Sequence, residues 1–376
     1  MQINILTPSL SHNCLGRAYI LAKALSDKHQ ATIIGPLYPV GLWPPLRSET
    51  FSYVALPTTT GLRSLLTLRA MMEAIEGDIV YVSKPLYPGL LAGIWHKKQN
   101  GNRLLVDIDD YEAGGFARLS LLHQMLSLLR FDRADAYPLL IQGTFQLIGH
   151  ADAITVSSTY LQKRFGGIIV PHGRDTDWLN PANYEQADCK KSLGLDSHQV
   201  VMFLGTPRPH KGLEELILAI KQLNRPNLCL ALVGFAEDSP YVQKLKYAAN
   251  GAARFFPPQP FAALPEFLAA ADLLVIPQQT DSFSQGQVPA KVFDAMAMAK
   301  PIVATAVSDL PQILADETGL IVKPDSVEAL AQGIGYLLDH PDEAIKMGQR
   351  ARDRCTRYYS WSVMAQLLES LLYQGA

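Results

Sequence analysis

The turn Gly205-Thr206-Pro207-Arg208-Pro209-His210-Lys211-Gly212 lies between a predicted strand that ends at Leu204 and a predicted helix that begins at Leu213. A continuous apolar run predicts the strand, and apolar residues at helical spacing predict the helix. The first turn of a helix has free backbone N–H groups and the positive end of the macrodipole, to which Arg208 and Lys211 add two cations. The turn therefore predicts the binding of a phosphorylated ligand.

This turn differs from the two familiar phosphate-binding loops. In the Walker A loop a Lys and a Ser or Thr follow the second Gly, whereas Lys211 precedes Gly212 and no hydroxyl is placed for magnesium. The Gly-x-Gly-x-x-Gly fingerprint of dinucleotide-binding domains does not occur in the chain. On this stretch alone, an ordinary turn with solvated Arg208 and Lys211 remains an open alternative.

Length and charge restrict the class of protein. The chain has 376 residues, of which 48% are hydrophobic, and this length exceeds what a single core usually supports. The formal net charge of −2 argues against a protein that coats nucleic acid, because such proteins carry a basic excess. We therefore expect two domains and no nucleic-acid partner.

The cysteines and the apolar segments indicate a cytoplasmic protein. Cys14, Cys189, Cys229 and Cys355 lie far apart, without the spacing of a zinc site or a disulfide framework. We find neither a secretory leader nor an apolar run of about 18 residues, the length that a spanning helix needs.

A largely apolar helix predicted at 118–131 leaves two alternatives open, namely core packing and peripheral contact with the inner face of a membrane or a lipid-linked acceptor.

Strands and helices alternate along the chain, which is typical of doubly wound parallel sheets. Strands are predicted at 3–6, 31–34, 79–82, 103–107, 153–156 and 167–170, and again at 200–204, 229–233, 273–276, 302–304 and 319–322. A polar stretch at 177–196 separates the two sets. The sequence thus predicts an α/β chain with Rossmann-like domains at 1–177 and 178–358, followed by an amphipathic helix within 359–376.

A second polar segment, 282–288, precedes Pro289 at the start of another predicted helix. Lys291 and Asp294 share one face of this helix, because residues three apart are neighbours there. An exposed ion pair and a pair that faces a ligand are both open alternatives. Phe293 is expected to turn toward the core.

The turn at 205–212 and the segment 293–305 together resemble the retaining glycosyltransferases of the GT-B fold, specifically family 4 (glycosyltransferase group 1). The segments 151–157 and 169–175 are also similar to parts of this family. The resemblance covers essentially the whole chain and is most specific in its C-terminal half. It implies two Rossmann-like domains that face a central cleft, with a nucleotide-diphosphate sugar bound by the second domain, an acceptor bound by the first, and a final helix that crosses back to the first domain.

The resemblance assigns roles to residues of the C-terminal domain. Lys211 and Arg208 would hold the diphosphate as it leaves, although Thr206 stands where the family usually has Arg. Asp294 would bind the donor ribose, and Lys291 would add a third cation near the phosphates. The remaining expected donor-binding residues are Gly205, Ser284, Gln285, Gly286, Gln287 and Val288. Gly286 stands where the family has its first motif Glu, so Asp281 or Gln287 is expected to replace that acid.

In the N-terminal domain the expected ligand-binding turn is Ser9–Arg17, at the carboxyl edge of the first strand. By the same resemblance, Gly16 would let the donor phosphates approach, and His12 is a candidate hydrogen-bond partner for acceptor or sugar. Arg17 is expected to be a solvent-exposed residue of the first helical turn.

Carboxylates are concentrated after the predicted strand at 103–107: Asp107, Asp109, Asp110 and Glu112. Such a cluster suggests either divalent metal binding or acid/base chemistry. We interpret Asp110 as a catalytic-site residue that contacts sugar or acceptor, and Asp107 as structural. No metal site is assigned, since the resemblance is to metal-independent enzymes.

The resemblance, together with the cations of the 205–212 turn, implies a retaining, metal-independent hexosyltransferase. It would move a sugar from a nucleotide-diphosphate sugar to a hydroxyl of a glycan, lipid or small-molecule acceptor, and it would need no cofactor. Lys211, Arg208 and Asp110 are the predicted catalytic residues. Two alternatives remain open: a GT-B-type sugar-nucleotide epimerase, and a donor-binding protein without turnover.

Overall fold

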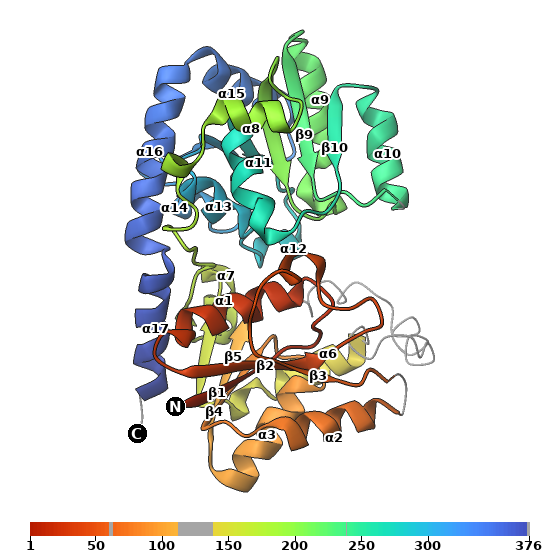
Figure 1. The fold of residues 1–376 in the computed structure, drawn as a ribbon, viewed down its shortest axis with the longest axis vertical. Helices are drawn as coiled ribbons and strands as arrows, with labels where there is room; N and C mark the ends of the chain where they lie inside the picture. The colour runs from red at the N-terminus through yellow and green to blue at the C-terminus, as the bar shows by residue number, and fades with distance from the viewer. Residues whose placement is uncertain (60–62, 112–137, 238, 374–376) are drawn as a thin grey trace. The chain divides into compact units, whose positions relative to one another are not determined.

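The computed structural model describes residues 1–59, 63–111, 138–237 and 239–373, which fold into two compact units (Figure 1). One unit comprises Met1–His172 with Met364–Ala376, and the other comprises Gly173–Val363. The predicted helix at 118–131 and Glu112 lie outside the described residues. Within the described residues, no helix is long and apolar enough to cross a membrane.

The N-terminal unit contains a seven-stranded parallel sheet in the order β3-β2-β1-β4-β5-β6-β7. Its strands are β1 (Gln2–Leu6), β2 (Gln30–Pro36), β3 (Tyr53–Leu56), β4 (Ile79–Ser83), β5 (Arg103–Ile108), β6 (Ala153–Val156) and β7 (Ile168–Ile169). Its described helices are α1 (Cys14–Ser26), α2 (Ser64–Ala74), α3 (Gly89–Asn100), α6 (Pro138–Gln146) and α7 (Thr159–Phe165), with most of α17 (Trp361–Tyr373). Helix α1 covers one face of the sheet, and α2 and α3 cover the other (Figure 1).

The C-terminal unit contains a six-stranded parallel sheet in the order β10-β9-β8-β11-β12-β13. Its strands are β8 (Gln199–Leu204), β9 (Leu228–Val233), β10 (Ala253–Phe256), β11 (Leu273–Ile276), β12 (Ile302–Thr305) and β13 (Leu320–Val322). Its helices are α8 (Gln186–Ser192), α9 (Leu213–Leu223), α10 (Pro240–Ala249), α11 (Leu264–Ala270), α12 (Ser282–Gln285), α13 (Lys291–Ala297), α14 (Leu310–Ile313), α15 (Val327–Asp339) and α16 (Pro341–Tyr358).

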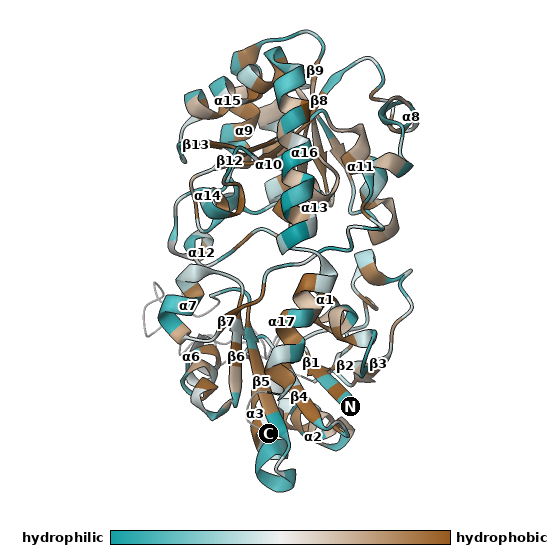
Figure 2. Ribbon diagram, turned by 90° about the vertical axis from the view of Figure 1, so that its left-hand side faces the viewer, coloured by the Kyte–Doolittle hydropathy of each residue, from teal (hydrophilic) through white to brown (hydrophobic). Residues whose placement is uncertain are grey.

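The hydrophobic cores lie on both faces of the two sheets. In the C-terminal unit, one core contains residues of α8, α11, α13 and α16, and a second contains residues of α9, α10 and α15. Helix α16 presents a hydrophilic side to solvent, whereas the sheet strands are mostly hydrophobic (Figure 2). A strand buried on both faces reads as a continuous apolar run, and this explains why β8 and β11 were predicted correctly.

The two predicted doubly wound sheets are therefore confirmed, but the sequence analysis missed β3 and β10. Both are edge strands, and most of their side chains are only partly buried. Arg254 interrupts β10 with a charge, and β3 is an apolar run of only four residues, a length at which a strand is hard to distinguish from other buried segments.

Each sheet reverses its strand order beside its first strand, between β1 and β4 in one unit and between β8 and β11 in the other. Open α/β sheets bind ligands outside the carboxyl ends of their strands at such a switch point. Topology thus selects the loop after Leu6 and the loop after Leu204 as candidate binding loops.

Beneath the first of these edges lies a buried polar network centred on Asp107. Arg17 donates two hydrogen bonds to this carboxylate, at 2.9 Å from Nε and 2.8 Å from Nη2, and Thr155 donates a third at 2.6 Å. The guanidinium also donates to the backbone carbonyl oxygens of Val170 and Pro171, each at 2.9 Å. Burial lowers the pKa of Arg17, but the charge and hydrogen bonds of Asp107 outweigh it and raise the pKa above its ordinary value.

The expected structural role of Asp107 is confirmed, whereas the expected solvent exposure of Arg17 is wrong. Arg17 is only 3% exposed. A charged residue in the first turn of an amphipathic helix is usually solvated, and only the long-range approach of Asp107 makes its burial favourable.

We predict that Arg17→Met destabilises the protein by about 3–5 kcal/mol, because it leaves the Asp107 carboxylate buried without its cation. The double substitution Arg17→Met/Asp107→Asn should recover part of that loss. Urea unfolding of the full chain measures both. Arg69→Met, which removes the exposed Arg69–Glu73 pair, is the control and should leave the midpoint nearly unchanged. An equal midpoint for Arg17→Met and Arg69→Met would contradict the prediction.

Candidate functional site

The candidate site in the C-terminal unit forms where β8 ends and α9 begins. After Gly205 the chain makes a short 3-10 turn, Pro209–Lys211, and reaches α9 through Gly212, whose φ of 64° is left-handed. A Cβ at Gly212 would lie 1.9 Å from the carbonyl oxygen of Pro277, so only glycine fits between β8 and the end of β11. Gly212 thus brings the two strand ends of the switch point together.

The two predicted catalytic cations lie on this loop. Lys211 is half-buried, and its Nζ donates to the carbonyl oxygen of Thr206 at 2.7 Å, which curls the side chain over the loop. Arg208 is exposed and caps the 3-10 turn through its backbone. Lys211 and Arg208 therefore lie on the same turn, and the Lys211 side chain is held by its hydrogen bond to Thr206.

The second polar segment packs against the same loop. The backbone N–H of Gln279 donates to the carbonyl oxygen of His210 at 2.9 Å, and the rings of His210 and Phe283 lie 4.9 Å apart. Gln278 donates from its side chain to the carbonyl oxygen of Ser284 at 3.3 Å. Residues 69 and 73 positions apart in the chain thus form one surface at the carboxyl edge.

The five predicted donor-binding residues of this segment occupy different environments. Gln285 and Gln287 are half-buried, Gly286 is buried, and Val288 is 3% exposed within the core. Ser284 is fully buried, and its hydroxyl has no hydrogen-bond partner among the described residues. Asp281 accepts from the backbone N–H of Ser284 at 2.6 Å and so caps α12. A donor role for these residues stays a prediction.

Lys291 is buried against the end of β8. Its Nζ lies 3.5 Å from the centre of the Phe203 ring, and a Cβ on Gly205 would be 3.1 Å from it. Among the described residues the ammonium has no hydrogen-bond partner. Burial, followed by the charge of Lys211, lowers the pKa of Lys291 well below its ordinary value, and Asp294 only partly opposes this. A buried cation without a partner lies beside the predicted phosphate loop.

Asp294 pairs with Arg174 and not with Lys291, which corrects the expectation that Lys291 balances its charge. The Nε of Arg174 donates to Oδ1 of Asp294, and its Nη2 donates to Oδ2 at 3.3 Å and to the carbonyl oxygen of Ala290 at 3.2 Å. Both side chains are 7% exposed. Phe293 turns to the core as predicted. A fork of guanidinium N–H groups fits a carboxylate better than one ammonium does.

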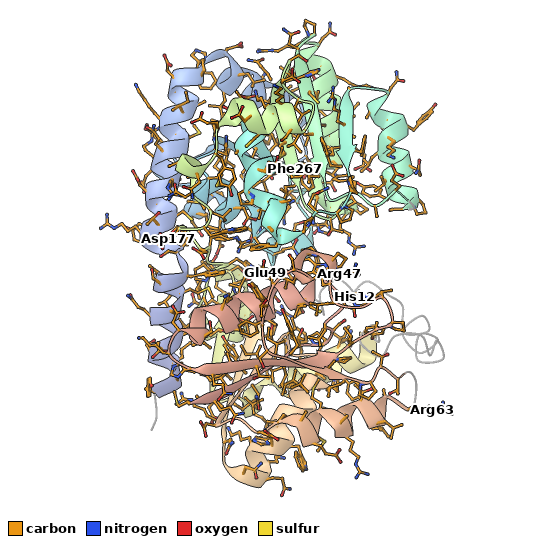
Figure 3. All side chains as sticks on the ribbon, viewed as in Figure 1. His12, Arg47, Glu49, Arg63, Asp177 and Phe267 are labelled. Atoms are coloured by element: carbon orange, nitrogen blue, oxygen red, sulfur yellow. The ribbon has the colours of Figure 1, made fainter. Side chains whose placement is uncertain are left out.

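Two of the predicted ligand residues of the N-terminal unit have contacts within that unit. A Cβ on Gly16 would lie 3.2 Å from the ring of Trp43, so packing alone accounts for a small residue there. His12 lies in the loop between β1 and α1 (Figure 3), and its Nδ1 is 2.8 Å from the hydroxyl of Ser9. Donor or acceptor contacts for Gly16 and His12 remain predictions.

The sequence analysis missed Lys84, which organises the carboxylate cluster. Lys84 follows β4 with a left-handed φ of 71°, and its Nζ contacts Oδ1 of Asp109 at 2.9 Å and Oδ2 of Asp110 at 2.8 Å. Asp110 is thereby held at the switch-point edge. A strained backbone at a buried Lys is typical of functional sites, although one Lys after an apolar strand gives little signal in a sequence.

The carboxylates of this cluster therefore divide between two cations. Asp107 turns to Arg17, whereas Asp109 and Asp110 turn to Lys84. Among the described residues there is no group of three or more His, Cys, Asp or Glu side chains that is placed to hold a metal ion.

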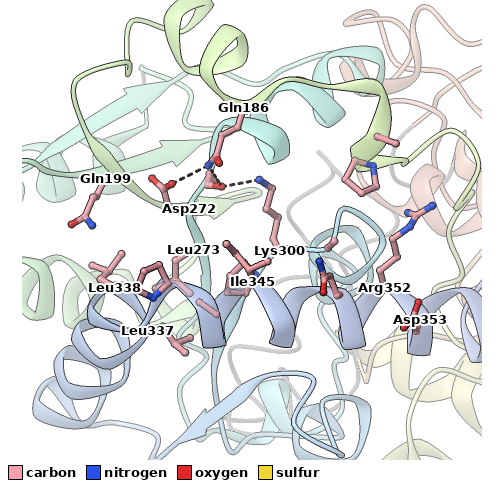
Figure 4. A pocket seen from close by; sticks show the side chains of 18 residues that line it. Gln186, Gln199, Asp272, Leu273, Lys300, Leu337, Leu338, Ile345, Arg352 and Asp353 are labelled. Carbon is pink, nitrogen blue, oxygen red and sulfur yellow. Dashed lines mark hydrogen bonds between the residues drawn. The ribbon is translucent and has the colours of Figure 1, made fainter.

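A cavity of about 560 Å³ opens at the opposite, amino edge of the C-terminal sheet (Figure 4). Two of its charged groups already have partners: Lys300 donates to the carbonyl oxygens of Ala269 and Ala271 at 2.7 and 2.9 Å, and Asp272 accepts from Lys190 at 2.6 Å. Polar groups that are satisfied internally give a ligand little to bind. The carboxyl edge is the better candidate site.

Comparison with known proteins identifies a family to which the C-terminal unit is similar. Residues 185–354 match the family described as "Glycosyl transferases group 1". They include the 205–212 loop, the 282–288 segment, Lys291 and Asp294, so the candidate site lies inside the group 1 domain.

The curated relatives and the solved structures extend the comparison beyond this domain. The chain is 29% identical to a D-inositol 3-phosphate glycosyltransferase of Corynebacterium aurimucosum over 60% of its length. It is 30% identical to a GDP-mannose-dependent alpha-(1-6)-phosphatidylinositol monomannoside mannosyltransferase of Mycolicibacterium smegmatis over 59%. It spans 58% and 62% of these relatives.

Among solved structures, HepE of Anabaena in complex with UDP-glucose aligns with a TM-score of 0.77 over 99% of both chains, at 18% identity. A glycosyltransferase of Rickettsia africae aligns with a TM-score of 0.74 over 100% of this chain and 99% of its own, at 16% identity. The GT-B fold predicted from the group 1 motifs is thus confirmed.

We predict that Arg174→Met destabilises the protein by about 3–5 kcal/mol, since the Asp294 carboxylate would stay buried without its partner. Adding Asp294→Asn to Arg174→Met should restore part of the loss, because the buried charge is then removed. Urea unfolding gives the coupling between the two positions. Arg225→Met removes an exposed pair with Asp339 in the same unit and should have little effect. Strictly additive losses for the two positions would rule the coupling out.

Proposed function

We propose that this chain is a retaining glycosyltransferase that moves a sugar from a nucleotide-diphosphate sugar to an acceptor hydroxyl. The observation that carries the proposal is the set of cations around Gly205, at the carboxyl edge of the group 1 domain. Lys211 and Arg208 lie on the loop, and Lys291 is buried beside it without a hydrogen-bond partner among the described residues. A diphosphate would bring anionic oxygens to this set of cations.

The relatives support a hexose donor. One is named as a GDP-mannose-dependent mannosyltransferase, and HepE was solved with UDP-glucose. We propose that Asp294 accepts the ribose hydroxyls of the nucleotide. Each carboxylate oxygen has two lone pairs, so the contacts with Arg174 leave capacity for further hydrogen bonds.

We assign the acceptor to the N-terminal unit, with Asp110 as the contacting carboxylate and Lys84 as the residue that positions it. The names of the relatives include inositol 3-phosphate and phosphatidylinositol monomannoside. A hydroxyl of a glycan, lipid or small molecule is therefore the proposed nucleophile.

The chemistry needs no nucleophile from the protein. The bond between the acceptor oxygen and the anomeric carbon forms on the face from which the phosphate leaves, while the bond from that carbon to the phosphate oxygen breaks. The acceptor proton passes to the departing phosphate oxygen. Negative charge then grows on the diphosphate, and cations that are already in place stabilise it without reorganisation. Lys211 and Arg208 are the proposed catalytic residues.

Two other functions use the same site, and product analysis distinguishes all three. A glycosyltransferase makes a new glycoside, a sugar-nucleotide epimerase converts the donor sugar, and a binding protein returns the donor unchanged. Thermal unfolding with UDP-, GDP- and ADP-sugars should first identify the donor, because a ligand that binds only the native state raises the unfolding temperature.

We predict that Lys211→Ala lowers turnover with saturating donor by roughly 10²-fold, the scale of losing one preorganised donor to a developing charge. Steady-state rates of nucleoside diphosphate release measure this. Lys221→Ala, on the exposed side of α9, is the matched control and should keep the wild-type rate. Wild-type turnover in Lys211→Ala would refute its catalytic role.

We also predict that activity survives EDTA, because Lys and Arg side chains supply the positive charge that a divalent ion supplies in other transferases. The same release assay, run after dialysis against the chelator, tests this. If activity were lost in EDTA and recovered with manganese, the cluster of Asp109 and Asp110 would have to be reconsidered as a metal site.

A further inference from the structure

Lys291 is the buried cation of the candidate site whose charge has no partner in the described protein. Lys291 is the first residue of α13, and its side chain ends against the Phe203 ring and Gly205. Lys291 is 8% exposed, and its Nζ has no hydrogen-bond partner among the described residues. Isolated ionised groups are costly to bury, and they reduce that cost by losing their charge.

The charged groups around Lys291 do not neutralise it. From the 3-10 turn, Lys211 repels it. From its own helix, Asp294 attracts it, but that carboxylate is committed to Arg174 by hydrogen bonds to both oxygens. Phe203 of β8 offers only the face of its ring. The balance favours the uncharged amine in the free protein.

An anion beside Gly205 reverses this balance. A diphosphate brings negative charge and acceptor oxygens next to Nζ, and opposite charge at such a distance favours the protonated form. The glycine leaves the space that this approach requires, because a Cβ there would itself be 3.1 Å from Nζ.

We propose that Lys291 is neutral in the free protein and takes up a proton when the diphosphate of the nucleotide sugar binds, so that donor binding is coupled to protonation. The proton comes from solvent and the new bond is N–H on Nζ, so no other group changes its covalent state. This inference rests on the proposed function, since the nucleotide sugar is its anion.

The sign of the pH dependence follows from this order of events. The pKa of Lys291 is lowered in the free protein by burial and is raised again by the bound anion. Donor affinity is therefore highest below the pKa of the free protein and falls as the pH rises toward the pKa of the complex, by up to about tenfold per pH unit for one proton.

The test is titration calorimetry of the full chain with UDP-glucose and with GDP-mannose in buffers of different ionisation enthalpy. The diphosphate of these nucleotide sugars is fully ionised at mildly alkaline pH, and the N–H of the uracil or guanine ring loses its proton only in more alkaline solution. The slope of the binding enthalpy against the ionisation enthalpy of the buffer therefore counts mainly protons taken up by the protein. At about pH 8.5, where an ordinary His is neutral, we expect roughly 0.5–1 proton per bound nucleotide sugar.

Three variants make the assignment specific. Lys291→Met should remove the uptake and weaken binding. Lys291→Arg should bind without uptake, because a guanidinium stays charged at every relevant pH. Lys300→Met is the matched control: Lys300 is also buried, with a pKa lowered by burial to about 8, but it lies at the opposite edge of the sheet and should leave the uptake unchanged.

The outcomes separate this inference from the proposed function. Binding of either nucleotide sugar without proton uptake overturns the coupling and leaves the transferase assignment standing. Uptake that persists in Lys291→Met but disappears in His210→Gln assigns the proton to the histidine of the loop and also overturns the inference. If none of the UDP-, GDP- and ADP-sugars of the thermal screen binds, both proposals fail.

Discussion

The cost of removing charge from water controls the arrangement of both units at the carboxyl edges of their sheets. Arg17 and Arg174 are buried, and each forms a forked pair with one carboxylate, Asp107 or Asp294. Such pairs need close geometry to offset desolvation, so each one fixes the elements that carry it. Arg17 holds α1 to the segment after β7, and Arg174 holds the segment after His172 to α13.

Lys291 departs from this pattern, and the departure points to function. Every other buried cation discussed above is balanced by a carboxylate or by carbonyl oxygens, whereas Lys291 faces an aromatic ring and a glycine. A cation–π contact stabilises an ammonium by far less than the loss of water costs it. A buried amine without a partner is tolerated where a ligand supplies the opposite charge, which is why groups with perturbed pKa values collect at binding sites.

Much of the fold was predictable from the sequence. The central strands are apolar runs in the sequence because parallel strands are buried on both faces. The loop at 205–212 is recognisable as a phosphate-binding candidate because its cations lie within a few residues of a helix N-terminus. The edge strands β3 and β10 were not predicted, because β3 is an apolar run of only four residues and Arg254 interrupts β10 with a charge.

The sequence by itself determined the two-sheet α/β architecture, the group 1 loop and the places of Lys211, Lys291 and Asp294, because these depend on local pattern and short spacing. Only the tertiary structure decided which charges meet. Arg17 and Asp107 are 90 residues apart and Arg174 and Asp294 are 120 apart, and the partners of a buried charge are chosen by the sheet topology that brings distant strand ends together. The three-residue spacing of Lys291 and Asp294 suggested a pair, but the tertiary contact with Arg174 prevailed because a guanidinium binds both carboxylate oxygens at once.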